Sequence, residues 1–411
     1  MKLKQLISRA KQSLYLKNIL TITFGTGIAQ FFPIIFLPII SRLYLPDDYG
    51  EYALFISIIA ILEILVTVHY NRAIMLPKEV EYASALMNIS FTINIIISSI
   101  IFCGSLIYSF ISRNYIYILI PIPVFLAGMN IMLSIWNNRN KNYKIISSSR
   151  ILSGILMPSF QIGAFFLIGG KGLIIAFVIS QLLVCIFLLV KTPNLHLCIC
   201  NYKDNTSLLY RYKNFVYYDL PSTITNTVTV QLPTFIMKSF VGAASTGNFN
   251  FSNRLLGVPL FLLASSVGEV FRQSVMESIH KVGNCKRVFI KTFLLLSSLS
   301  LPVFIIVFLF APRFFGIIFG TAWSDAGYYV QILSFLFFIR FVVSPLSYVL
   351  VAVEKLNEQF FIQILKLVLS TIGLLGGYLI YRTPESMLLF YVTGYSLSYI
   401  YELYRSYVAS L

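Results

Sequence analysis

Two charged residues of the sequence lie inside long apolar runs, where charged side chains are rare. Arg340 and Glu63 each stand near the middle of such a run. If the runs cross a bilayer, a charge at the centre costs about 2.5–3.5 kcal/mol on insertion scales, so it normally faces a water-filled cavity or a partner. Two interpretations stay open: each residue lines a cavity, or both are structural, either as an ion pair with each other or in separate hydrogen-bonded networks.

A polar stripe marks the apolar run 215–238. Its members concentrate on one side of an expected helix and are Asp219, Ser222, Thr223, Asn226, Thr227, Gln231 and Thr234. Such a stripe predicts either the lining of a cavity that hydrogen-bonds a hydroxyl-rich ligand or a contact between helices. Pro221 and Pro233 predict interruptions of this helix, which would leave free carbonyls that a cavity could solvate.

Four further cations stand nearer the ends of apolar runs: Arg72, Arg254, Arg272 and Lys366. The planar fork of arginine can bind a phosphate through two parallel hydrogen bonds, which makes these residues candidates for anion binding. Alternatively, Arg254 reaches the membrane edge with its long side chain, while Lys366 lies deeper in its run and is an intermediate case. Arg72 and Arg272 could equally be charges of inner helix ends.

The composition places these residues in a membrane protein. The chain has 411 residues, of which 58% are hydrophobic and only 11% charged. A soluble domain needs about 25% charged residues to cover its surface, whereas one membrane helix needs about 20 mostly apolar residues. The sequence therefore predicts an all-α polytopic membrane protein that lies in a lipid bilayer.

Twelve apolar spans can be counted, and the basic residues orient them. With both termini cytoplasmic, 22 Lys and Arg fall in inside segments, 6 in outside loops and 3 within spans. This alternation follows the positive-inside rule. Because the +16 net charge is spread over many membrane-edge segments, it does not indicate nucleic-acid binding. The spans lie near 18–40, 52–73, 86–111, 115–136, 147–168, 172–190, 215–238, 249–271, 289–311, 327–350, 358–381 and 385–404.

Features recur about 200 residues apart and predict a duplicated six-helix unit. Pro33 has a counterpart in Pro233, Arg72 in Arg272, and the turn at 49–52 in that at 246–249. We therefore expect two six-helix lobes, 1–204 and 205–411. Transporters built from such parallel repeats hold substrate between the halves.

Several segments resemble the polysaccharide biosynthesis flippases, the Wzx-type exporters of the multidrug/oligosaccharidyl-lipid/polysaccharide (MOP) superfamily. They are Asn18 with Gly25, Gly27 and Gln30, then FFPIIFLPIISRLYLPDDYGEYALF (31–55), RAIMLPKEVEYASALMNIS (72–90), GNFNFSNRLLGVPLFLLASSVGEVFR (247–272) and FFGIIFGTAWSDAGYYVQILSF (314–335). The resemblance implies the fold of the MATE transporters. It also implies transfer of undecaprenyl-pyrophosphate-linked oligosaccharide repeat units across a bacterial inner membrane, for O-antigen, capsule or another surface polysaccharide. A polymerase and a chain-length regulator of the same pathway are the partners it suggests.

The related lipid II flippases use arginines of spans 1, 2 and 8 in a central cavity. No Arg or Lys occurs between Asn18 and Arg42, so nothing carries over for span 1.

Two alternative functions stay open. A cation-coupled multidrug exporter of the same fold is disfavoured because Arg340 and Lys366 would repel organic cations. A membrane polymerase or glycosyltransferase could use the acidic pair Asp47 and Asp48, which otherwise resembles a turn. The sequence contains no GxxxxGK[ST] phosphate-binding motif, no spacing of ligands for a metal and no cofactor signature, so we expect a transporter rather than an enzyme.

Overall fold

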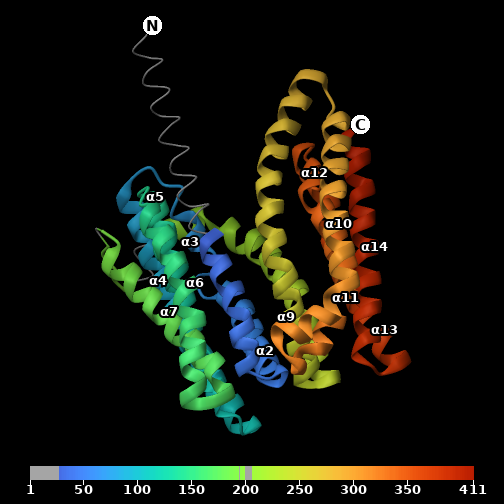
Figure 1. The fold of residues 1–411 in the computed structure, drawn as a ribbon. Helices are drawn as coiled ribbons and strands as arrows, with labels where there is room; N and C mark the ends of the chain where they lie inside the picture. The colour runs from blue at the N-terminus through green and yellow to red at the C-terminus, as the bar shows by residue number, and fades with distance from the viewer. Residues whose placement is uncertain (1–26, 194, 200–205) are drawn as a thin grey trace. The chain divides into compact units, whose positions relative to one another are not determined.

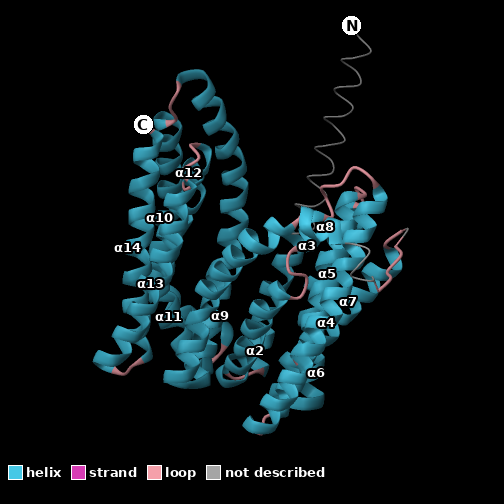
Figure 2. Ribbon diagram, turned by 180° about the vertical axis from the view of Figure 1, so that it is seen from behind, coloured by secondary structure: helices cyan, strands magenta, loops and turns pink. Residues whose placement is uncertain are grey.

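The structure is a computed structural model that describes residues 27–193, 195–199 and 206–411, apart from the side chains of 258–266, 269 and 356. Within these residues every regular element is a helix and no strand occurs (Figure 2). Six of the described helices are long and apolar enough to cross a membrane. The predicted fold class, an all-α multi-pass membrane protein, is confirmed. The count of twelve spans and the cytoplasmic termini stay predictions.

The described helices follow the apolar runs of the sequence (Figure 1). In the first half they are a helix over Gly27–Leu43, α2 (Pro46–Leu65), α3 (Tyr70–Ala73), α4 (Val80–Ser112), η1 (Tyr115–Leu119), α5 (Pro121–Arg139), α6 (Tyr143–Ile168), η2 (Gly169–Lys171) and α7 (Gly172–Lys191). In the second half they are α8 (Thr206–Arg211), η4 (Phe215–Asp219), α9 (Leu220–Val282), α10 (Lys286–Phe319), η5 (Thr321–Trp323), α11 (Ser324–Leu346), α12 (Tyr348–Ala352), α13 (Leu356–Tyr381) and α14 (Pro384–Ser410). Residues 18–26 of the first predicted span lie outside the described residues.

The expected breaks at Pro221 and Pro233 are wrong. Helix α9 runs through both prolines, and its only described non-helical backbone is at Gly242 (φ 86°, ψ −176°). Pro221 closely follows the helical turn η4 and Pro233 stands in the helix interior, and the backbone stays helical at both. Gly242 adopts a backbone conformation that a side chain would disfavour. The two spans predicted at 215–238 and 249–271 therefore join at this residue, without a loop between them.

The predicted continuous span 52–73 is also wrong in one respect. Helix α2 ends at Leu65 and α3 begins at Tyr70, with left-handed backbone at Val68 (φ 46°) and His69 (φ 61°) between them. At the other end of α2, the predicted turn at Asp47 and Asp48 is the first helical turn. There the Asp48 carboxylate accepts a hydrogen bond from the Leu45 N–H at 3.1 Å.

By its contacts the chain divides into two compact units. The first comprises the described residues up to Ile40 together with Phe55–Val228, and the second comprises Ser41–Leu54 with Thr229–Leu411. Each unit thus takes a short segment from the opposite half of the sequence. The two six-helix lobes expected from the repeat, 1–204 and 205–411, stay a prediction.

In the first unit α4, α5, α6 and α7 pack side by side (Figure 1). One end of this bundle has a buried core that includes Leu86, Met132 and Trp136, and Ala73 and Ile74 at the end of α3 pack into it. The hydroxyl of Tyr70 donates a hydrogen bond to the Leu209 carbonyl at 3.3 Å. These contacts fix α3, and with it Arg72, to the bundle.

In the second unit α10, α11, α13 and α14 form the helical bundle. Segment 41–54 packs into it through residues 49–52. The turns predicted at 49–52 and 246–249 are wrong, because these residues lie within the helices α2 and α9. A Cβ on Gly50 would lie 2.0 Å from the Ala243 carbonyl oxygen, and one on Gly247 would lie 1.9 Å from that of Pro46. The indole of Trp323 donates to the Ser41 carbonyl at 2.7 Å. The two related segments therefore meet backbone to backbone, as helices.

Candidate functional site

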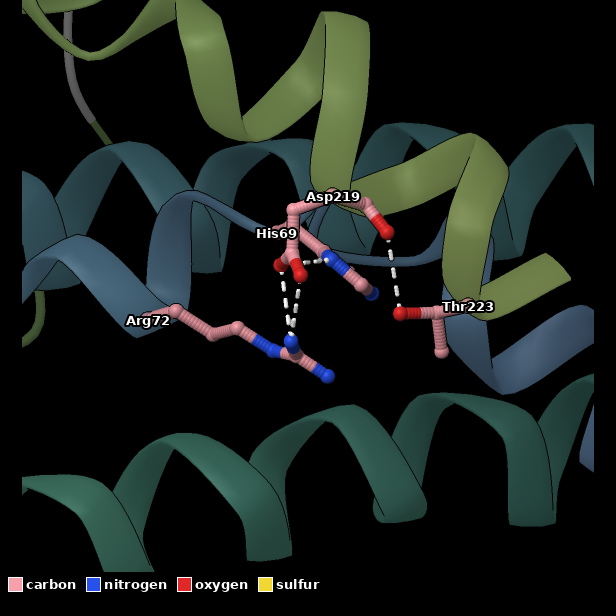
Figure 3. Close-up of polar contacts among 4 residues, drawn as sticks. All are labelled: His69, Arg72, Asp219 and Thr223. Carbon is pink, nitrogen blue, oxygen red and sulfur yellow. Dashed lines mark hydrogen bonds and ion pairs between the residues drawn. The ribbon is translucent and has the colours of Figure 1, made fainter. Parts of the chain in front are cut away.

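A cluster of three polar side chains joins α3 to the segment before α9 in the first unit. Arg72 directs Nη1 at both carboxylate oxygens of Asp219, at 2.7 and 2.8 Å. On the other side of the carboxylate, Nδ1 of His69 lies 2.6 Å from Oδ2 (Figure 3). The Asp219 carboxylate thus contacts two side chains, one in the break between α2 and α3 and one in α3.

The break between α2 and α3 places His69 and Arg72 on this carboxylate. Three-residue turns close the break, with Val68 N–H donating to Leu65, Tyr70 N–H to Thr67 and Arg72 N–H to His69. A non-glycine residue in the left-handed region costs of order 1–3 kcal/mol and persists only where surrounding structure enforces it. Two such residues in succession indicate that the cluster and the core of the first unit hold this backbone.

Asp219 also stands on an irregular element. It ends the π-helical turn η4, where the Leu220 N–H bonds to the Phe215 carbonyl. The hydroxyl of Thr223 donates to the backbone carbonyl of Asp219 at 2.9 Å (Figure 3). Single π-turns occur frequently at functional sites because they rotate a side chain out of the regular helical register.

The three side chains of the cluster differ in how much of their surface is exposed to solvent. The side chain of His69 is 6% exposed, that of Asp219 32% and that of Arg72 46%. Arg72 engages one nitrogen, and the described residues offer no partner to Nη2 or Nε. The cluster therefore presents a buried imidazole behind a carboxylate, with part of a guanidinium still available to an anion.

Arg340 occupies the middle of α11 in the second unit. Its side chain is exposed, and no carboxylate of a described residue in this unit pairs with it. Tyr399, Tyr395 and Tyr391 of α14 lie near this guanidinium. This guanidinium therefore lies near tyrosines, and no carboxylate in the described part of its own unit neutralises its charge.

Lys366 has its charge matched instead. Its Nζ lies 2.8 Å from Oε2 of Glu402, and both side chains are buried. The ammonium also lies 4.2 Å from the ring centroid of Tyr399. This residue thus faces the interior of the unit, between α13 and α14.

Two predicted arginines contact tyrosines of the second unit. Nη1 of Arg254 donates to the hydroxyl of Tyr49 at 3.1 Å, and the guanidinium of Arg272 lies 5.3 Å from the ring centroid of Tyr348. Arg254 is partly buried and Arg272 exposed.

The remaining candidates are polar residues on separate helices. Glu63, on α2, is partly buried and has no ion pair with a described residue of its own unit. Asn226 is exposed in the first unit, and Gln231 is partly buried in the second. The structure brings together Arg72 and Asp219 among the predicted residues of the first unit. No group of three or more His, Cys, Asp and Glu side chains among the described residues could hold a metal ion.

The sequence itself identifies the family. Residues 39–328, more than half of the chain, match the family described as polysaccharide biosynthesis protein. The chain belongs to this family. No curated protein sequence matches it.

Solved structures show the fold that this chain shares. A mutant of the Vibrio cholerae MATE transporter VcmN is 15% identical, with 96% of this chain and 97% of that chain covered and a TM-score of 0.61. The lipid II flippase MurJ in an inward closed conformation is 13% identical over 97% and 88% of the two chains, also with a TM-score of 0.61. A MOP superfamily transporter from Pyrococcus furiosus is 14% identical over 95% and 94%, with a TM-score of 0.57. The fold is therefore that of the MATE and MOP transporters.

Two partners in these contacts, His69 and Glu402, are missed by sequence reasoning. His69 is three residues before Arg72, but the helix break removes the regular spacing that would relate them. Glu402 lies near the end of the last apolar run, where charged residues are common and do not indicate a buried site. Its position i+3 from Tyr399 was the available signal, because such residues share a helix face.

Proposed function

We propose that this protein is a flippase that moves undecaprenyl-pyrophosphate-linked oligosaccharide units from the cytoplasmic to the outer leaflet of a bacterial inner membrane. Membership of the polysaccharide biosynthesis protein family supports the class of substrate, and the transporter fold supports translocation rather than catalysis. A polymerase of the cell surface would then consume the product, with a chain-length regulator acting after it.

The observation that carries this proposal is Arg340. A guanidinium keeps its proton, so in the middle of a membrane helix it remains a positive charge. Within the second unit that charge is exposed and lacks a carboxylate partner among the described residues. A pyrophosphate supplies the missing negative charge and fits the guanidinium fork. An organic cation would be repelled at the same place.

The membrane potential is compatible with this direction of transport. Moving negative charge outward from an inside-negative cell is favourable by about 2.3 kcal/mol per charge per 100 mV. No nucleotide would then be required.

Complementation of a gene deletion tests the proposal. The deletion strain should accumulate a lipid-linked saccharide on the cytoplasmic side, and the wild-type gene should restore surface polymer. Arg340→Gln should nearly abolish polymer at unchanged protein level, while Arg340→Lys should retain part of it because the charge survives without the fork. Arg313→Gln, which changes an exposed arginine of α10, is the matched control and should leave polymer unchanged.

Other outcomes would decide for the alternatives. If Arg340→Gln lowers the protein level and added Glu63→Gln restores both protein and polymer, the arginine serves a structural ion pair. Full polymer from Arg340→Gln would reject the substrate role. Efflux of organic cations without an accumulated lipid-linked saccharide would instead indicate a multidrug exporter.

A further inference from the structure

The cluster of His69, Arg72 and Asp219 has the form of an occupied anion site. Its occupant is a side chain of the protein itself, the Asp219 carboxylate. Arg72 holds this carboxylate through one nitrogen only, and 46% of its side chain remains exposed. A guanidinium that binds through its fork would use two nitrogens, so the intramolecular contact leaves part of its binding capacity unused.

We propose that Asp219 is an internal stand-in for a phosphate, and that a phosphate of the lipid-linked substrate displaces it from Arg72. This inference rests on the proposed function for the source of the phosphate. A phosphate offers more acceptor oxygens than a carboxylate and can engage Nη2 and Nε of Arg72, to which the described residues give no partner. The exchange breaks no covalent bond and replaces one ion-pair partner of the arginine by another.

The backbone around the cluster is suited to such an exchange. Asp219 links α3 to the beginning of α9, so its release frees these two elements from each other. On one side the link is attached to the left-handed residues Val68 and His69, and on the other to the π-turn η4. Backbone held in sparsely populated conformations can relax when its restraint is removed. Substrate binding would thereby be coupled to a movement of the start of α9 relative to α3.

The cluster lies at the end of α3 and at the start of α9, which the positive-inside distribution predicts to be cytoplasmic. A lipid-linked pyrophosphate is present in that leaflet before transport. The site would therefore take up substrate before Arg340, in the middle of α11, receives it.

Binding measurements on the purified full-length protein in nanodiscs test the exchange. The probes are inorganic pyrophosphate and undecaprenyl pyrophosphate. Asp219→Asn removes the internal competitor and should tighten binding of both probes by about tenfold, the equivalent of about 1.4 kcal/mol. Adding Arg72→Gln to Asp219→Asn should abolish the gain, because it removes the group for which the two anions compete.

Glu358→Gln is the matched control. It removes a carboxylate that pairs with Arg405 in the second unit at 2.6 Å, with side chains 29% and 31% exposed. It should leave the affinity for both probes unchanged. Should Asp219→Asn fail to give a monodisperse protein, His69→Gln replaces it, because it weakens the hold on the carboxylate and should tighten binding to a smaller extent.

The outcomes separate this inference from the proposed function. No tightening by Asp219→Asn with either probe, or a gain that persists without Arg72, overturns the exchange; Arg340-dependent export would survive that result. Tightening for inorganic pyrophosphate alone overturns the lipid-linked source and argues against the proposed function. Equal tightening in Glu358→Gln would show a nonspecific charge effect and also overturn the exchange.

Discussion

At the scale of single residues, the five cations singled out by the sequence have different surroundings. Arg72 and Lys366 each contact a carboxylate, at 2.7 and 2.8 Å, whereas Arg254 donates to a tyrosine hydroxyl. Arg340 and Arg272 are exposed beside aromatic rings. A buried pair is satisfied internally, so a cation in such a pair is less available to substrate than one without a partner. This ranks Arg340 above Lys366 as a ligand-binding residue.

Lys366→Met should destabilise the protein by about 3–5 kcal/mol, because it leaves the buried carboxylate of Glu402 unpaired. The double variant Lys366→Met with Glu402→Leu should recover most or all of the loss, since an apolar pair of similar size replaces both charges. Unfolding midpoints of the detergent-solubilised protein measure the effect. If the stable double variant has lost export, Lys366 contacts substrate after all.

At the scale of elements, close backbone contact between helices depends on glycine at particular positions. Gly50 on α2 approaches the Ala243 carbonyl so closely that a methyl group would lie 2.0 Å from its oxygen, whereas a methyl on Gly104 of α4 would meet nothing within 4 Å. Both glycines are helical, so alanine should favour each helix by about 1 kcal/mol when packing does not oppose it.

Gly50→Ala should therefore lower stability by about 1–3 kcal/mol through overpacking. Gly104→Ala, the control, should leave stability unchanged or raise it. Fluorescence-detected thermal unfolding and membrane immunoblots report the two effects. Equal stability of the two variants would mean that α2 and α9 do not meet at Gly50 as described.

At the scale of the whole molecule, the distribution of basic residues predicts the orientation of every segment. The 22 inside and 6 outside cations require both termini and the segments 191–214 and 272–288 to be cytoplasmic. Segments 41–50 and 312–326 should lie outside.

Reporter fusions at these four segments measure the orientation directly. Cytoplasmic reporters should be active at 191–214 and 272–288, and periplasmic reporters at 41–50 and 312–326. A periplasmic signal from 191–214 would reverse the second half and with it the parallel repeat.

The amino-acid sequence alone is enough to predict a helical membrane protein and to assign its family. Apolar runs need no tertiary information, because a bilayer demands local backbone hydrogen bonding and therefore helices. It also singled out Arg72 and Asp219, since charges near membrane helices are conspicuous by composition alone. The ion pair between Arg72 and Asp219, the contact of His69 with the same carboxylate and the pair between Lys366 and Glu402 are visible only in the folded structure. Those contacts depend on a helix break at 66–69 and on packing between helices distant in sequence, and neither leaves a periodic pattern that could be extrapolated along the chain.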